Sequence, residues 1–182
     1  MSKVLWHITM SLDGFIAGPG DDMGWMGDYF GPNPTVDDVL SRIGAVLIGA
    51  RTYQAGKTED GKVYGGAWTG PQFVLTHAAP DTAAPGFTFV GGDIGTAVRL
   101  AKAAAGDKYV VVFGASTAKQ VLDAGMLDEI LVHIAPVLLG DGVRLFNHPG
   151  DTNVKLEQIG LTQSTQVANL WLRTKQHLQP LF

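Results

Sequence analysis

Short runs of apolar, mostly β-branched residues recur along the chain, and each is bounded by glycine or polar residues. The run over 109–113 is continuous, which is typical of a strand buried on both faces of a sheet. It stops at Gly114, and apolar residues then recur at intervals of three and four as far as Leu122, which predicts a helix. Gly125 follows, at a place where helices commonly end in a left-handed residue. Similar runs predict strands over 4–10, 45–48, 72–76, 87–90 and 130–135.

The rest of the pattern predicts two further helices, a hairpin and two loops. Thr35 is the expected N-cap of a short helix, and Asp93 is the expected N-cap of a helix over 94–105. Because strands and helices mostly alternate, we expect one α/β domain over residues 1–182 with a mostly parallel sheet. The other predicted segments are an antiparallel hairpin over 154–161 and 167–173, and glycine-rich loops over 15–28 and 54–70.

The strand, glycine turn, helix and strand from 109 to 135 predict a right-handed βαβ crossover. Its turn at Gly114 leaves free backbone N–H groups at a helix N-terminus, where a phosphate group would bind. Ligands of such sheets bind outside the carboxyl ends of the strands. We therefore expect 13–14, 49–53 and 114–117 to converge at one edge of the sheet, and the pattern favours a nucleotide-binding enzyme.

Composition and charge narrow the classes of partner. Of the 182 residues, 46% are hydrophobic and 16% are charged, which favours a substantial core over disorder. The net charge of −4 argues against a nucleic-acid partner, which needs a basic face. The sequence has no apolar run of about 20 residues and no signal-peptide pattern, so we expect no membrane association and a cytoplasmic protein. Cysteine is absent and the histidines lack metal-ligand spacing, so we expect no metal site.

Several segments carry a resemblance to a known family. They are 11–17, 46–53, 74–77, 124–129, and 136–142 followed by 145–146. At these residues the chain resembles the dihydrofolate reductase-like superfamily, and in particular the branch with the reductase domain of riboflavin biosynthesis. The resemblance covers about residues 4 to 173. It implies a dihydrofolate reductase-like fold and an NADPH-dependent reductase of a small molecule, similar to a 5-amino-6-(5-phosphoribosylamino)uracil reductase.

The resemblance also implies a cofactor site across the strand ends, with the pyrophosphate between the helix starts at 51–52 and 115–117. Arg51 offers the forked donors that suit a phosphate, although an ordinary surface arginine is the alternative. Ala50 stands where relatives carry arginine, so the choice between NADPH and NADH stays open. Ala115 stands where relatives often carry a second glycine, which bears on the backbone geometry of the cofactor site. The cofactor residues implied are Gly49, Arg51, Thr52, Thr76, His77, Gly114, Ala115, Ser116 and Thr117.

The resemblance also implies that loops around the same edge of the sheet bind the substrate. Reduction of a C=N bond needs a proton as well as a hydride, and Asp28 is the nominated donor. Asp13 either closes the first turn or reaches the substrate. Trp25, Gly140 and Asp141 are the other residues expected at the substrate.

His7 and His133 lie in apolar strands, where a buried histidine satisfied by a neighbour is the leading interpretation. Three alternative functions remain open at this point: dihydrofolate reduction, dinucleotide binding without catalysis, and a structural dimerisation module. The edge strand of the closing hairpin is a possible homodimer contact. Without cysteine, a zinc deaminase of the histidine and cysteine type is excluded.

Overall fold

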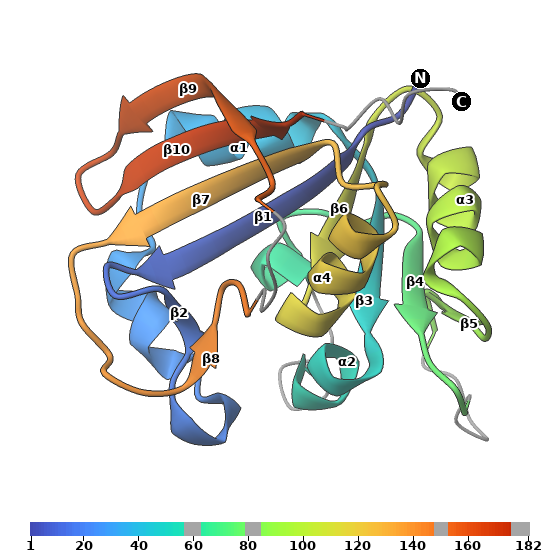
Figure 1. Ribbon diagram of the computed structural model, residues 1–182, viewed down its shortest axis with the longest axis horizontal. Helices are drawn as coiled ribbons and strands as arrows, with labels where there is room; N and C mark the ends of the chain where they lie inside the picture. The colour runs from blue at the N-terminus through green and yellow to red at the C-terminus, as the bar shows by residue number, and fades with distance from the viewer. Residues whose placement is uncertain (57–62, 79–84, 148–152, 176–182) are drawn as a thin grey trace.

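The computed structural model describes residues 1–56, 63–78, 85–147 and 153–175. Their strands are β1 (Val4–Ser11), β2 (Phe15–Ala17), β3 (Ile43–Gly49), β4 (Gln72–Leu75), β5 (Phe87–Val90), β6 (Tyr109–Phe113), β7 (Glu129–Ala135), β8 (Val143–Arg144), β9 (Leu156–Gln163) and β10 (Ala168–Thr174). Eight of them form one sheet in the order β5-β4-β3-β6-β1-β7-β10-β9 (Figure 1). Neighbours from β5 to β7 are parallel, whereas β10 is antiparallel to both β7 and β9. The predicted mostly parallel α/β sheet with a C-terminal antiparallel hairpin is confirmed.

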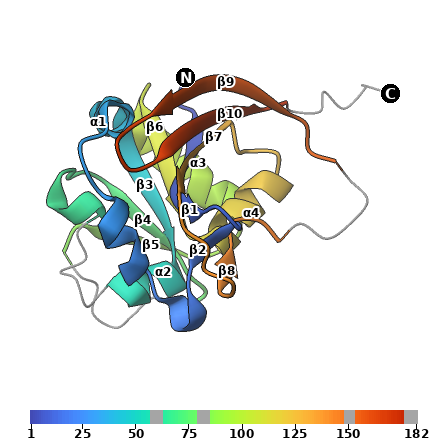
Figure 2. The same cartoon turned by 90° about the vertical axis from the view of Figure 1, so that its left-hand side faces the viewer.

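Helices cover both faces of the sheet, as the side view in Figure 2 shows. They are α1 (Pro34–Ser41), α2 (Ala50–Gly56), α3 (Ile94–Ala105) and α4 (Ala115–Asp123). α3 and α4 pack on one face and α1 packs on the other. Side chains of β1 alternate between the two faces. Val4, Trp6 and Ile8 enter the core under α3 and α4, while Leu5 and His7 face the side of α1.

The ends of the helices show which capping predictions hold. Asp93 accepts a hydrogen bond from the Thr96 backbone nitrogen at 2.9 Å, so the predicted cap of α3 is confirmed. The predicted cap of α1 at Thr35 is wrong, because Asn33 is the N-cap and its side chain accepts from the Thr35 nitrogen. Pro34 explains the difference: proline has no N–H and suits the first helical position, so the cap lies one residue before it.

The predicted loop over 15–28 contains ordered elements. β2 pairs with the distant β8, and the 3-10 helices η1 (Pro19–Asp21) and η2 (Gly24–Tyr29) follow it. The predicted loop over 54–70 begins inside α2 and contains the 3-10 helix η4 (Val63–Gly66), while residues 57–62 lie outside the described part. Neither short strand has a local periodicity, because each is stabilised by pairing with a segment far away in the sequence.

Candidate cofactor and substrate site

Two strand ends meet at the carboxyl edge of the sheet, where β3 and β6 are neighbours. Gly49 ends β3, and a Cβ atom at this position would clash with the Thr117 hydroxyl. Gly114 follows β6 with φ +96°, and a Cβ atom there would lie 2.5 Å from the Thr52 hydroxyl oxygen. Each glycine therefore admits a threonine from the opposite turn. We call Gly49, Thr52, Gly114 and Thr117 the glycine–threonine junction, and its formation confirms the predicted meeting of 49–53 with 114–117.

The third predicted strand end lies at the same edge but farther out. The register places Trp6 of β1 beside Val112, one residue before β6 ends, and β1 continues to Ser11. Those extra residues carry the end of β1 about 13–16 Å past the end of β6, at about 3.3 Å per residue. The turn at Asp13 thus faces a different part of the edge from the junction.

The first turn of α4 presents backbone donors beside this junction. Gly114 is the N-cap residue and has no side chain that could accept from the N–H groups of the helix. Those N–H groups point out of the helix N-terminus, where the helix dipole also favours an anion. Ala115 is half-buried, Ser116 is exposed and Thr117 is buried. The turn can therefore accept a phosphate group through its backbone, with the Ser116 hydroxyl on the open side.

Arg51 lies in the first turn of α2 with an exposed side chain and binds an acidic partner. Its Nε and Nη2 atoms donate to the two carboxylate oxygens of Asp21 at 2.8 and 2.7 Å. Asp21 is the last residue of η1 and has φ +64°, which is uncommon for a residue with a side chain. The forked donors predicted for a phosphate are present, and in this structure a carboxylate occupies them.

Thr76 and His77 follow β4 at the same edge. The Thr76 hydroxyl donates to the Ala78 carbonyl at 2.9 Å and accepts from the Ala78 nitrogen at 3.2 Å. This side chain therefore closes its own turn, while His77 is exposed. Their expected contact with the adenosine part of a cofactor stays a prediction.

Asp13 bridges two loops through its carboxylate. One oxygen accepts from the Ser11 hydroxyl at 2.6 Å and from the Leu139 nitrogen, and the other accepts from the Gly140 nitrogen at 2.7 Å. The Ser11 hydrogen bond, helped by the backbone donors, lowers the pKa of Asp13 to about 2. The carboxylate is therefore ionised at neutral pH, and its contacts favour a structural role over proton donation. It also places Gly140, next to which Asp141 is exposed and accepts from the Gly142 nitrogen.

Trp25 and Asp28 lie on η2. Asp28 is exposed, and its nomination as proton donor stays a prediction. The Trp25 ring is half-buried beside Tyr29, and its indole nitrogen is buried without a hydrogen-bond partner. A buried donor of this kind is costly unless a ligand or water accepts from it. The indole nitrogen of Trp6 in the core is in the same situation, so the place of Trp25 at the substrate stays a prediction.

The prediction that His7 and His133 are buried and satisfied by neighbours is confirmed, but sequence reasoning missed who the neighbours are. The Nε2 atoms of the two rings lie 2.6 Å apart, so the histidines satisfy each other. His7 Nδ1 contacts the Tyr64 hydroxyl, and His133 Nδ1 contacts the Asn169 amide oxygen. Both strands show only a histidine at an apolar position, and the pairing depends on the β1–β7 register, which periodicity does not reveal.

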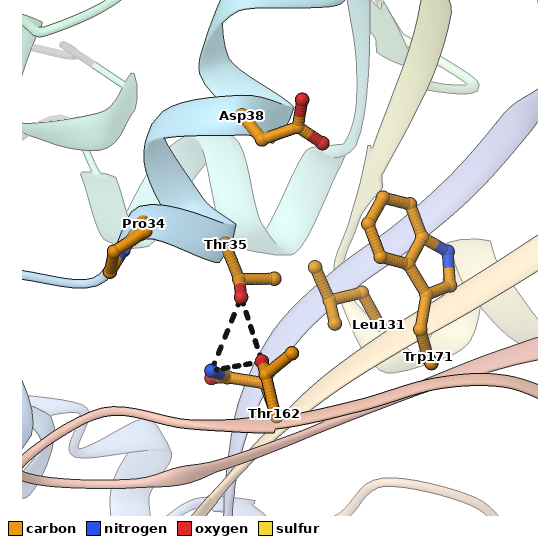
Figure 3. Close-up of a pocket in the computed structure, with 8 residues that line it drawn as sticks. Pro34, Thr35, Asp38, Leu131, Thr162 and Trp171 are labelled. Carbon is orange, nitrogen blue, oxygen red and sulfur yellow. Dashed lines mark hydrogen bonds between the residues drawn. The ribbon is translucent and has the colours of Figure 1, made fainter.

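A cavity of about 240 Å³ lies away from the junction, between α1 and the strands β7, β10 and β9. Figure 3 shows the Thr35 and Thr162 hydroxyls facing each other in this cavity, 2.8 Å apart, with Trp171 and Leu131 on the apolar side. Asn169 also lines it. None of the residues predicted for cofactor or substrate does so.

The described part of the chain shows neither a metal centre nor a membrane span. Within it, no group of three or more histidine, aspartate or glutamate side chains is placed to hold a metal ion. Among the same residues, no helix combines the length and the apolar character needed to span a membrane.

Comparison with known proteins assigns the sequence to a family and the structure to a known fold. The family model described as RibD C-terminal domain matches residues 2–170, which is nearly the whole chain. A putative riboflavin biosynthesis protein from Shewanella sp. PV-4 is 20% identical and has a TM-score of 0.80, with 96% of this chain and 99% of that chain covered.

Two further solved structures have the same fold. The first is a diaminohydroxyphosphoribosylaminopyrimidine deaminase/5-amino-6-(5-phosphoribosylamino)uracil reductase from Thermotoga maritima, at 15% identity and TM-score 0.69, where 95% of this chain covers 56% of that one. The second is dihydrofolate reductase from Enterococcus faecalis complexed with NADP(H), at 14% identity and TM-score 0.61, with 95% and 96% covered. The fold is therefore dihydrofolate reductase-like.

Proposed function

Because the chain belongs to the RibD C-terminal domain family, we propose that it is an NADPH-dependent reductase that transfers a hydride to a small heterocyclic or ribosyl-pyrimidine substrate. The reaction would be of the 5-amino-6-(5-phosphoribosylamino)uracil reductase type. One observation carries the proposal: the glycine–threonine junction brings two strand-to-helix turns together at the edge of the sheet where dinucleotides bind in α/β folds.

The residues at this edge suit a dinucleotide. Backbone N–H groups at 115–117 would hold the pyrophosphate, with the hydroxyls of Thr52 and Ser116 near it. Gly49 and Gly114 are needed for the close approach of the two turns, since a side chain at either position would clash with the opposite threonine. Arg51 would bind a further phosphate in place of Asp21. Thr76 and His77 would lie on the adenosine side.

The protein would bind the substrate, orient it and deliver one proton. When bound, the cofactor supplies the hydride, and its chemistry needs little from the protein beyond placement. Reduction of a C=N bond adds a proton at nitrogen, and Asp28 is the proposed donor from η2. Asp13, ionised and bound to the 139–140 backbone, would position Gly140 and Asp141 at the substrate. The indole N–H of Trp25 would donate to an acceptor on the ligand.

Thermal unfolding with saturating NADPH, with NADH and without cofactor tests the proposal. A ligand at 100 times its Kd stabilises by about 2.7 kcal/mol, which raises the melting temperature by roughly 5–10 °C for a chain of this size. A shift with NADPH alone is expected. A shift with both cofactors would remove the role of Arg51 at a 2′-phosphate, and no shift with either would remove the cofactor site.

A dinucleotide-binding protein without catalysis is the second candidate, and Asp13 favours it because hydrogen bonds from Ser11, Leu139 and Gly140 give this nominated catalytic carboxylate a structural role. NADPH that binds but is not consumed with any pyrimidine substrate or with dihydrofolate would select this candidate. Consumption with dihydrofolate would select dihydrofolate reduction.

A homodimer through the edge strand β9 also remains a proposal. Among the described strands β9 is the last in the sheet order, and it exposes Leu156, Ile159 and Leu161. Light scattering on the purified protein measures the oligomeric state directly.

A further inference from the structure

A chain of five polar side chains crosses the sheet on the side of α1. It runs from Asn33, the N-cap of α1, through Asn169, His133 and His7 to Tyr64 on η4. Successive polar atoms lie 2.9, 2.6, 2.6 and 2.7 Å apart. The two asparagines and both histidines are buried. Their hydrogen bonds are therefore not exchanged for water, and the direction of each can be worked out.

The direction is set by the backbone at the start of α1. The Thr35 N–H can only donate, and it donates to the Asn33 side-chain oxygen. The Asn33 nitrogen then donates to the Asn169 oxygen at 2.9 Å, and the Asn33 oxygen also accepts from the Asn169 nitrogen at 3.2 Å. The Asn169 oxygen is thereby an acceptor. His133 Nδ1, 2.6 Å from the same oxygen, must carry a hydrogen.

The tautomers of the two histidines follow from this step. Burial lowers the pKa of His133, and burial together with the nearby His133 lowers the pKa of His7 to about 3, so both rings are neutral at pH 7. A neutral His133 with its hydrogen on Nδ1 has a bare Nε2, which accepts from His7 Nε2. His7 then has a bare Nδ1, and the Tyr64 hydroxyl must be its donor. The His7 Nδ1 atom is therefore a hydrogen-bond acceptor.

Tyr64 reaches this acceptor from a strained backbone. Its φ is +54° and the next residue, Gly65, also has a left-handed φ of +60°. A left-handed conformation is unfavourable for a residue with a Cβ atom. The Tyr64 ring packs against His7 at 5.5 Å and against Phe113 at 5.4 Å, measured between ring centroids. Phe113 directly precedes Gly114, so the Tyr64 ring contacts the residue next to the glycine–threonine junction.

We propose that His7 Nδ1 is a specificity-determining acceptor for the substrate, and that the Tyr64 phenol holds this place until the substrate displaces it. The ligand class is a planar ring that stacks beside Phe113 and offers an N–H or O–H donor to His7. The inference rests on the proposed function, because the position of the substrate follows from the cofactor junction. Exchange of one donor for another keeps His7 satisfied, and release of Tyr64 relieves its left-handed backbone.

Asn33 sets the direction of the hydrogen bonds between these five side chains, so a substitution at this position tests the assignment. In Asn33→Asp the carboxylate still caps α1 by accepting from Thr35, but its second oxygen replaces the Asn33 nitrogen and faces the Asn169 oxygen, so two acceptors meet. Asn169 relieves this contact by turning its nitrogen toward the new carboxylate and His133. The turn puts the hydrogen of His133 on Nε2, which moves the His7 hydrogen to Nδ1. The acceptor of the wild type becomes a donor.

Nitrogen-15 NMR of the imidazoles tests this in the wild-type protein. We expect the proton of His7 on Nε2 and the proton of His133 on Nδ1 at pH 7. A protonated His7 Nδ1 in the wild type would overturn the inference. Asn33→Asp is expected to move the His7 proton to Nδ1, while Asp93→Asn, the reverse exchange at the cap of α3, should change neither ring.

Two pyrimidine probes test the ligand class. 5,6-diaminouracil offers N–H donors, whereas 1,3-dimethyluracil has none. We expect only the first to shift the His7 signals, to bind roughly 2- to 12-fold tighter to Tyr64→Phe, which lacks the competing hydroxyl, and to lose its advantage in Asn33→Asp. Tyr109→Phe, which removes a hydroxyl bound to Glu129 instead, is the matched control and should bind like the wild type.

Equal binding of both probes, weaker binding to Tyr64→Phe, or no response of His7 to the diamino probe would each overturn the inference. NADPH is titrated into the same samples to separate the two proposals. The predicted tautomers and probe response without an NADPH shift would contradict the proposed function alone. An NADPH shift with the opposite tautomers would contradict this inference alone.

Discussion

Acidification from pH 8 to pH 5 is expected to destabilise the fold through its buried histidines. The pKa of His7 falls from 6.5 in the unfolded chain to about 3 in the fold. Between these values the unfolded chain binds a proton that the folded chain does not, so the free energy of unfolding decreases as the pH falls. At pH 5 His7 alone accounts for a loss of about 2 kcal/mol relative to pH 8. His133 acts in the same direction, since its pKa is also lowered.

A loss of this size is a large part of the 5–15 kcal/mol that is typical of a folded domain. Urea unfolding at pH 8, 6 and 5 measures it as a lower midpoint at constant slope. The double variant His7→Gln with His133→Gln should lose less between pH 8 and pH 5, and His77→Gln, at an exposed histidine, should lose as much as the wild type.

The carboxylate of Asp13 titrates in a different window. Its pKa is lowered to about 2, so its stabilising contribution is present above its unfolded value near 3.8 and disappears as the pH falls through 2.

A free energy of unfolding that stays constant from pH 8 to pH 5 would show that burial does not keep the imidazoles of His7 and His133 neutral. The assignment of their tautomers would fail with it.

The junction and the ion pair give further predictions. Gly114→Ala should destabilise by about 2–4 kcal/mol in urea unfolding, because φ is +96° and the new Cβ atom meets the Thr52 hydroxyl. Gly125→Ala, with φ +67° and open space, should cost only about 1–2 kcal/mol, and adding Thr52→Ala to Gly114→Ala should recover part of the difference. Equal losses at the two glycines would contradict the close approach. Asp21→Asn frees Arg51 and should raise NADPH affinity by up to about fivefold in calorimetry, the value of an exposed ion pair. Unchanged affinity would place Arg51 away from the phosphates.

Features with a local cause could be predicted from the sequence. The continuous apolar run over 109–113 is β6, and Asp93 caps α3 as expected. Gly114 and Gly125 both have positive φ, as a strand-to-helix turn and a helix end require. The parallel order of the strands then brings the turns after β3 and β6 together, so the main part of the candidate site could also be predicted.

Features that depend on contacts between distant segments could not be predicted. β2 forms by pairing with β8, and neither has enough residues for a periodic signal. Asp21 meets Arg51 across 30 positions, and the charges alone do not select this pair. Tyr64 lies in a glycine-rich segment without periodicity, and only the fold brings its hydroxyl to His7. The cap of α1 is a smaller case, where Pro34 was a local signal that Asn33 precedes the helix.

Hydrogen exchange measured by mass spectrometry, with and without saturating NADPH, tests the central claim that a dinucleotide binds at the glycine–threonine junction. Bound cofactor should slow exchange of the backbone amides at 49–52 and at 114–117 together, because both turns would contact it. The peptides of β9, at the far edge of the sheet, serve as the internal control and should exchange at unchanged rates. Unchanged exchange in both turns, or protection confined to the cavity beside α1, would contradict a cofactor site at this junction.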